Sequence, residues 1–399
     1  MAAGKYGEKR VRRMAKGETT HRSELDAESV TRVLREHAAA TLANEPEVTL
    51  ILDGMELRRA GAESQEALMR VKALDGGLVN GYRSFNVLGL GDSEARGLLY
   101  HHLFSSTEPG FESENREIQR AIDVTEASLQ TCTGPRTWVM DAGFDNDEVW
   151  WKVWGHGSHL VCRVYHLERL VEWQTPAGEW EERYLEATFK HLTRLATVET
   201  TLEVRLKGQR RAKRQRVTVH LSAVPMRVYA PGDRSQTKPA WIVSVEVEGA
   251  AGEPWYLLTD WPVTTQADAL RIFRFYRRRW SVEDTFKFIK TCFGAEEVQM
   301  LALEAIRRLV AYAWVAAGFL FHLGLTLDHA DVRLLARLGG WEPRANRPPG
   351  KLILTRGLRR LLDRLATDTI LQDHLDEFGD LPPFAKRILA RSNRSLLEH

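Results

Sequence analysis

Three acidic residues in this 399-residue chain, Asp53, Asp141 and Glu283, are candidates for one shared metal site. Asp53 follows the apolar run "VTLIL" and Asp141 follows "RTWVM", and both runs are typical of buried strands. Functional groups are displayed at the ends of central strands in an α/β sheet. Carboxylate oxygens are the natural ligands of Mg²⁺ or Mn²⁺. Two such ions about 4 Å apart activate an attacking oxygen and stabilise a leaving one, so the trio predicts phosphoryl-transfer chemistry.

Each acid alone also has a purely structural interpretation. An Asp that follows a strand is usually a turn former or a helix cap. Asp145, Asp147 and Asp260 occupy similar positions and qualify equally on position alone. The metal-site hypothesis therefore depends on the three acids being considered together.

The stretch "FYRRRWSVEDTFKFIK", residues 275–290, places the third acid, Glu283, among five cationic side chains. At about 100° per residue, two stripes run along a helix here. The apolar stripe holds Phe275, Val282, Phe286, Ile289 and Phe293, and the polar stripe beside it holds Tyr276, Arg279, Glu283, Lys287 and Lys290. A solvated ladder of i,i+4 ion pairs, stabilising by about 0.2–0.5 kcal/mol each, is one interpretation. A carboxylate kept ionised for metal by its cationic neighbours is the other.

The spacing of Ser281 and Asp284 resembles a capping box, which would restart the helix at this point. In that case Tyr276 and Arg279 belong to the preceding segment. Only Glu283, Lys287 and Lys290 would then share a face.

The elements that position these acids have the pattern of an α/β core. Strand-like runs at 48–52, 136–141 and 159–164 are combined with helical spacing at 115–132 and 265–293, and strands covered by helices make an α/β fold. Between 165 and 255 the pattern changes to short alternating segments such as "RVTVHLSAV". We expect a β-rich insertion there. The predicted regions are a basic arm and helix (1–44), the core in two parts (45–164 and 256–324) around the insertion (165–255), and a helical C-terminal region (325–399).

Composition narrows the classes of protein. Cys132, Cys162 and Cys292 lie far apart without a CxxC pair, which argues against a disulfide framework and a zinc knuckle and fits a reducing compartment. The N-terminal 17 residues are charged where a signal peptide needs an apolar core. The apolar run at 309–327 is long enough to be tested as a membrane span, but its small residues and His322 favour a buried helix. His101 and His102 are predicted to point to opposite faces of a strand as packing residues.

A second basic segment, "RLKGQRRAKRQR" at 205–216, contains no acid. Such a run is usually a solvated loop, but charge of a single sign also suits a phosphate backbone. Its candidate DNA contacts are Arg210, Arg211, Lys213 and Arg214.

Tyr276-x2-Arg279-x3-Glu283-x6-Lys290 resembles, without a gap, the YREK signature of the insertion-sequence-four family of DDE transposases, and most of all its transposon-five type. The order of "LILDGMEL", "WVMDAGFD" and the YREK stretch, with a β-rich insertion before the third acid, makes the resemblance specific over residues 45–310. Gly54-Met55 departs from the Thr pair that usually follows the first acid in this family.

The resemblance implies an RNase H-like core, a mixed sheet flanked by helices that a β-rich insertion domain interrupts, followed by a helical C-terminal region. It implies that Asp53, Asp141 and Glu283 are catalytic and bind two Mg²⁺ or Mn²⁺ ions. Tyr276, Arg279, Lys287 and Lys290 would hold transposon-end phosphates, Arg163 would lie near the terminal nucleotides, and Trp255 would stack a flipped base.

The activity that follows is cut-and-paste DNA transposition, with nicking at transposon ends, a hairpin intermediate and strand transfer. The expected partners are inverted-repeat end DNA, target DNA and a second copy of the chain, with no membrane, in a prokaryotic cytoplasm and at the nucleoid when DNA-bound. The alternatives are a catalytically inactive DNA-binding regulator derived from a transposase, and a plain RNase H-like nuclease.

Overall fold

The computed structural model describes residues 26–378, apart from 94, 176, 293, 298 and 343–348, and also residues 380 and 386. The basic arm expected at residues 1–25 lies outside this part. The described residues form two compact units. One of them ends at Phe321, and the other takes in the described residues from His322 onward. Each unit is considered by itself below.

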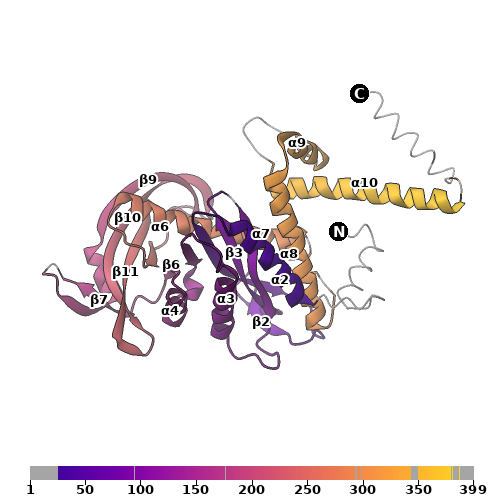
Figure 1. Cartoon of the computed structure of the whole chain (residues 1–399). Coiled ribbons are helices and arrows are strands. Elements are labelled where there is room, and N and C mark those ends of the chain that lie inside the picture. The colour runs from indigo at the N-terminus through magenta and orange to yellow at the C-terminus, as the bar shows by residue number, and fades with distance from the viewer. Residues whose placement is uncertain are drawn as a thin grey trace. The chain divides into compact units, whose positions relative to one another are not determined.

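A twelve-stranded sheet organises the described part of the first unit, in the order β2-β3-β1-β5-β6-β12-β11-β10-β7-β8, with β4 on β3 and β9 on β10 (Figure 1). The strands of its first half are β1 (Val48–Arg58), β2 (Met69–Lys72), β3 (Leu78–Gly91), β4 (Arg96–Phe104), β5 (Arg136–Met140) and β6 (His159–Val164). The remaining strands are β7 (Leu170–Gln174), β8 (Trp180–Tyr184), β9 (Thr193–Val204), β10 (Lys213–Ala230), β11 (Asp233–Val247) and β12 (Trp255–Thr259).

The sheet is mixed. β1, β5 and β6 run parallel to one another, whereas β3 pairs with β1 and β12 pairs with β6 in antiparallel fashion. A continuous apolar run makes β1 a strand that is buried on both faces, and Leu50, Ile51 and Leu52 have no exposed surface. The predicted α/β class is confirmed. The mixed sheet with its flanking helices is consistent with an RNase H-like core.

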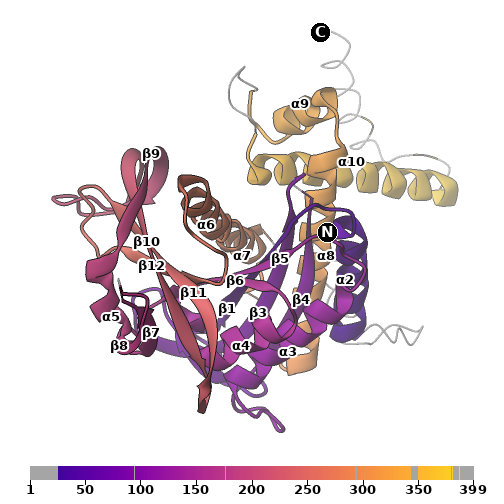
Figure 2. The ribbon, with the colours of Figure 1, turned by 60° about the vertical axis from the view of Figure 1, so that its left-hand side comes forward.

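Helices cover both faces of this half of the sheet. α2 (Ala27–Leu42), α3 (Glu114–Ser128) and α4 (Asp147–Gly155) share a core with Leu50 and Leu52. α6 (Gln266–Arg278) and α7 (Trp280–Cys292) cover the opposite face, because Arg278 reaches Thr49, and side chains alternate between faces along a strand. Figure 2 shows α6 and α7 apart from α3 and α4, with the sheet between them.

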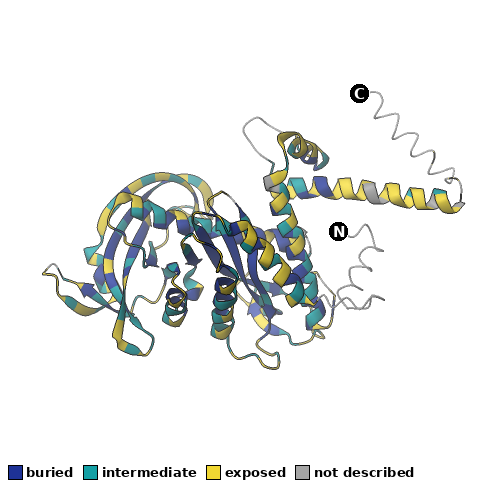
Figure 3. Ribbon diagram, in the orientation of Figure 1, coloured by how far each residue is buried: buried dark blue, intermediate teal, exposed yellow. Residues whose placement is uncertain are grey.

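The strands of the predicted insertion continue the core sheet through hydrogen bonds. β11 pairs with β12 from Trp241↔Thr259 to Val245↔Trp255, and β12 pairs in turn with β6. The short helix α5 (Leu185–Thr188) and the 3₁₀ turn Phe189–His191 connect β8 to β9. Buried residues continue along the sheet from β1 through β11 into β10 and β7, whereas the loops at the hairpin tips are mostly exposed (Figure 3). The region boundaries drawn from the sequence remain predictions.

α8 (Leu303–Thr326) contains the stretch predicted to be a buried helix. Its segment Leu303–Leu323 is long and apolar enough to cross a membrane by length and composition alone, and 39% of the qualifying window is buried within the protein. Trp314 is buried against His101 of β4 and Phe286 of α7. A core helix passes the same length and composition test, so α8 only weakly indicates a membrane span.

The second unit contains α9 (His329–Leu338) and α10 (Lys351–Phe378), which pack closely. A Cβ atom at Gly357 of α10 would lie 1.9 Å from the Leu335 carbonyl oxygen of α9. Glycine therefore allows the two backbones to approach.

Candidate active site

Asp53 lies in the middle of β1, opposite Asn86 of β3. The residue is buried, with 9% of its surface exposed. Its Oδ1 accepts a hydrogen bond from the N–H of Gly54 at 2.8 Å, and its Oδ2 accepts one from Nη1 of Arg279 at 3.0 Å. Both oxygens of this carboxylate therefore have partners within the protein.

Asp141 immediately follows β5, the parallel neighbour of β1. The register pairs Ile51 with Val139, so Asp53 and Asp141, each two residues further on, reach the same level of the sheet. The Oδ1 atom of Asp141 accepts the N–H of Gly143 at 2.8 Å and caps the 3₁₀ turn Ala142–Phe144. The predicted turn-forming role and the placement beside Asp53 are thus combined in one residue.

Glu283 reaches the same site from the first turn of α7. Its Oε1 accepts a hydrogen bond from Nη2 of Arg279 at 2.6 Å, and its side chain is 52% exposed. The helix is interrupted at Arg279, which is the C-cap of α6. Of the two alternatives drawn from the sequence, the one in which Tyr276 and Arg279 belong to the preceding segment is therefore correct. The restart does not use a capping box, because the Ser281 hydroxyl has no hydrogen-bond partner among the described residues.

The three carboxylates interact electrostatically. Burial raises the pKa of Asp53 to about 7, and the negative charge of Asp141 adds to the rise, as does that of Glu283 to a lesser extent. The Arg279 guanidinium and the Gly54 N–H oppose the rise but do not cancel it. Like charges facing one another across a site are what a divalent cation neutralises.

The donor set suits a divalent cation, but the carboxylates are not gathered around one point. No group of three His, Cys, Asp or Glu side chains in the described part of the chain is arranged to hold a metal ion. The Arg279 guanidinium instead bridges Asp53 and Glu283. Three carboxylates fit Mg²⁺ or Mn²⁺ by their chemistry.

Arg279 is buried, with 8% of its surface exposed. Burial disfavours its charge, yet Tyr276, Asp53 and Glu283 together raise its pKa above the ordinary value. Its Nε atom has no hydrogen-bond partner in the part of the chain that the structure describes. The side chain is therefore held at its tip, by the two carboxylates.

Tyr276 interacts electrostatically with Arg279, which bridges two of the acids, and its ring lies near that of Trp255. It is 3% exposed, and burial raises the pKa of its hydroxyl, which also interacts with Arg163 of β6. The ring of Trp255 lies 5.9 Å from that of Tyr276 and 5.7 Å from that of Trp280, centroid to centroid. Trp280 was not singled out from the sequence, although its position next to Arg279 in the YREK stretch was an available signal.

The remaining predicted DNA contacts differ in their exposure and in whether they form an ion pair within the protein. Lys287 is exposed. Lys290 forms an ion pair with Glu296 at 3.4 Å, and burial lowers its pKa. Arg210, Arg211, Lys213 and Arg214 are all exposed near the β9–β10 connection. This connection lies close to Trp255, because both line one cavity of about 550 Å³. The connection contributes Arg205, Lys207 and Ala212 to the lining.

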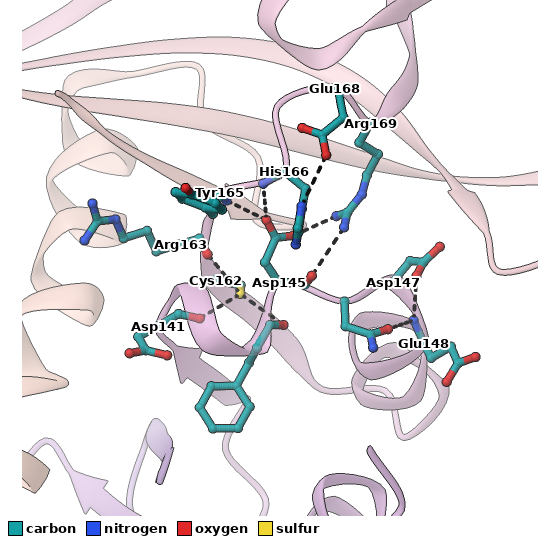
Figure 4. A network of polar contacts seen from close by, with 12 residues as sticks. Asp141, Asp145, Asp147, Glu148, Cys162, Arg163, Tyr165, His166, Glu168 and Arg169 are labelled. Carbon is teal, nitrogen blue, oxygen red and sulfur yellow. Dashed lines mark hydrogen bonds and ion pairs between the residues drawn. The ribbon is translucent and has the colours of Figure 1, made fainter. Parts of the chain in front are cut away.

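Asp145 is committed to a structural network beside the site (Figure 4). Its Oδ2 accepts the N–H groups of Tyr165 and His166, and its Oδ1 lies 3.0 Å from Nη1 of Arg169. Figure 4 shows the Asp141 carboxylate and the Arg163 side chain on one side of this network and Asp147 on the other. Asp145 therefore fixes the chain that leaves β6.

Asp147 and Asp260, the other two acids whose sequence positions resemble those of the proposed site, also have structural partners. Asp147 lies in the first turn of α4, where its Oδ1 accepts the N–H of Glu148. Asp260 accepts the N–H of Leu160 and lies 2.8 Å from Nδ1 of His159. Asp53, by contrast, interacts electrostatically with two other acids, Asp141 and Glu283.

A mixed sheet with one acid within β1, a second at the same level just after the parallel strand β5, and a third on a covering helix has the kind of acids that metal-dependent phosphoryl transfer requires. A family model described as a transposase DDE domain matches residues 110–317, just over half of the chain. The chain belongs to this family and is a DNA-cleaving transposase. The match contains Asp141 and Glu283, while Asp53 precedes it. DDE transposases use divalent metal ions.

Proposed function

We propose that the chain is a cut-and-paste DNA transposase of the YREK-signature, insertion-sequence-four type. The observation that supports this most directly is that Arg279 bridges Asp53 and Glu283, while Asp141 lies at the level of Asp53 beside the neighbouring strand. Acids from β1, β5 and α7 interact electrostatically although 230 positions separate the first from the last. Asp53 and Glu283 interact with Arg279 of the same signature, and so does Tyr276.

Asp53, Asp141 and Glu283 would hold the metal, two Mg²⁺ or Mn²⁺ ions. When bound, such ions supply charge stabilisation at the scissile phosphate and a more acidic water. Hydrolysis at the transposon end would free a 3′-hydroxyl, which would attack the opposite strand to give a hairpin. Hydrolysis of the hairpin would then regenerate the 3′-hydroxyl, which would attack the target DNA. The protein contributes mostly positioning and electrostatic stabilisation.

The chain's own residues hold the DNA end near these acids. Tyr276, Arg279, Lys287 and Lys290 would bind end phosphates, and Arg163 would lie against the terminal nucleotides. Trp255 would stack a flipped base, and it is half-buried beside a cavity of about 550 Å³. The charged residues that line this cavity are Arg205, Lys207, Glu203, Glu246 and Glu253. The exposed cations of the 205–216 segment extend the phosphate-binding surface.

The partners are inverted-repeat end DNA, target DNA and a second copy of the chain that bridges two ends. The setting is a prokaryotic cytoplasm, at the nucleoid when DNA is bound.

Cleavage of labelled inverted-repeat DNA in Mg²⁺ tests the proposal. Glu283→Gln should reduce the cleavage rate by at least about a hundredfold, because a ligand of the metal ions that would stabilise the reacting phosphate is lost. The neighbouring exposed Asp284→Asn is the matched control and should cleave normally. Cleavage by the Glu283→Gln protein at the wild-type rate would refute the assignment.

Two further readouts separate the other possibilities. Trp255→Ala should nick DNA but form little hairpin, and a normal hairpin yield would leave Trp255 as a packing residue. Specific end binding without metal-dependent cleavage would indicate a regulator derived from a transposase. Cleavage without strand transfer would indicate a nuclease.

A further inference from the structure

The position of the Arg279 guanidinium in the DNA-free chain conflicts with its proposed role in binding a DNA phosphate. As part of the proposed DNA-binding surface its guanidinium has to reach a phosphate, yet it is 8% exposed in the DNA-free chain. It points inward and spans Oδ2 of Asp53 at 3.0 Å and Oε1 of Glu283 at 2.6 Å. The same cation thus lies among the proposed metal ligands.

The bridged oxygens are the ones that a metal ion needs. Each oxygen of Asp53 accepts one hydrogen bond, Oδ1 from the N–H of Gly54 and Oδ2 from Arg279, and retains a second lone pair. A divalent cation bound to Oδ2 of Asp53 and Oε1 of Glu283 would lie against the positive charge of the Arg279 guanidinium, so the two cations compete for these carboxylates. The guanidinium also satisfies the charge balance, since it separates two carboxylates that would otherwise repel each other.

We propose that Arg279 takes the place of a divalent cation in the DNA-free chain and leaves it for a DNA phosphate, so that metal binding is coupled to DNA-end binding through this side chain. The inference rests on the proposed function, because Asp53 and Glu283 are its metal ligands. It adds an order of events. The end binds first, and the carboxylates are then free for metal.

The local structure permits such an exchange. Arg279 lies where α6 ends and α7 begins, so it is not held inside a continuous helix. Its Nε lacks a partner within the described residues, and the tip of the side chain carries its hydrogen bonds. A phosphate provides the same forked acceptor geometry as a carboxylate.

Lys290 shows the same pattern at the other end of the signature. It is paired with Glu296 and is partly withdrawn from solvent. Two of the four predicted phosphate ligands are therefore neutralised internally in the absence of DNA.

A structural ion pair is the competing explanation, and it makes a different prediction. If Arg279 only stabilises the fold, its removal lowers the melting temperature and does not strengthen metal binding. If it occupies the metal position, its removal strengthens metal binding to the DNA-free chain. Metal affinity therefore separates the two explanations without any measurement of catalysis.

The test measures Mn²⁺ binding to the full, DNA-free chain by electron paramagnetic resonance of free Mn²⁺. Arg279→Gln should bind Mn²⁺ more tightly than wild type, by a factor within the range of about 5–150 that is typical of coupled sites. Arg279→Lys keeps the charge but loses the fork, and an intermediate affinity is expected.

Arg278→Gln is the matched control, since it removes the same charge one residue away. Arg278 contacts Thr49 and Asp92 and does not contact the acids. It should change Mn²⁺ affinity much less than Arg279→Gln does. Equal effects of the two substitutions would show a general charge effect and overturn the proposal, as would unchanged or weaker Mn²⁺ binding by Arg279→Gln.

End DNA provides the second half of the experiment. Without divalent metal, a duplex with the inverted repeat is titrated in, and Mn²⁺ affinity is then measured again. The gain in Mn²⁺ affinity caused by DNA should be smaller in Arg279→Gln than in wild type, because part of the coupling is already removed. An equal gain in both proteins would overturn the coupling.

Failure of the proposed function gives a different result. If Asp53→Asn and Glu283→Gln leave Mn²⁺ binding to Arg279→Gln unaltered, the acids are not metal ligands, and both the proposed site and the exchange are wrong. If these substitutions abolish Mn²⁺ binding while Arg279→Gln binds as wild type does, the metal site stands and only the exchange is refuted.

Discussion

The buried charge of Asp53 leads to a stability prediction that does not involve catalysis. The pKa of this residue rises from 3.8 to about 7, chiefly through burial and then through Asp141. One pKa unit corresponds to about 1.4 kcal/mol. Ionising Asp53 in the metal-free, DNA-free chain therefore costs roughly 4 kcal/mol of folding free energy.

The sign follows from proton linkage. A carboxyl group with a raised pKa contributes its full stability while it is protonated, below pH 3.8, and this contribution is lost as the pH rises through about 7. Asp53→Asn keeps the shape of the side chain but cannot ionise. The difference in free energy of unfolding, variant minus wild type, should therefore increase by about 2–3 kcal/mol between pH 5 and pH 8.

The assay is urea unfolding followed by circular dichroism, in EDTA and without DNA, at several pH values. Taking the difference between two proteins cancels the titration of groups that they share. Asp145→Asn is the matched control, and its effect on the free energy of unfolding should have the opposite sign. The Asp145 carboxylate accepts two backbone N–H groups and pairs with Arg169, so its neutralisation should destabilise the protein. A difference between Asp53→Asn and wild type that stays constant or narrows toward pH 8 would refute the reasoning.

Three further predictions concern other parts of the chain. Glu126 is buried and holds Arg136 and the indole N–H of Trp138, so Glu126→Ala should lower the free energy of unfolding by about 3–5 kcal/mol in urea titrations. Gly357→Ala should disrupt the contact with Leu335 and lower the melting temperature, whereas Gly155→Ala, with open space around its Cβ position, should not. Replacing Arg210, Arg211, Lys213 and Arg214 by Gln should reduce the slope of log K against log salt for end binding by up to about four, and an unchanged slope would place these cations away from the DNA.

The sequence predicted the elements that carry the acids because the signals for them are local. A continuous apolar run followed by an acid marks β1 and β5. β5 ends just before Asp141 as expected, whereas β1 continues through Asp53 to Arg58 because it pairs with β3 along its whole length. The two histidines of β4 also point to opposite faces as predicted, with His101 contacting Asn86 and His102 contacting Glu117. Their side chains alternate because a strand has a period of two.

Interactions between distant segments could not be predicted in the same way. The spacing at Ser281 and Asp284 indicated a restart of the helix, but the ion pair from Arg279 to Asp53 involves residues 226 positions apart. Lys290 appeared to be a free cation because its partner Glu296 lies beyond the end of the helix. The resemblance identified which residues form the site, but not which of them are paired with one another before DNA arrives.

The pairing of β6, β12 and β11 has a mechanical consequence for the insertion. Because β12 hydrogen-bonds to a core strand on one side and to an insertion strand on the other, the strands that follow residue 165 are joined edge to edge with the strand that carries Arg163. If a bound duplex exerted a force on the cationic connection between β9 and β10, that force would pass to the core through continuous backbone hydrogen bonds. It would not have to cross a hinge. The insertion should therefore act as a rigid extension of the core, which keeps a constant spacing between the bound duplex and the acids.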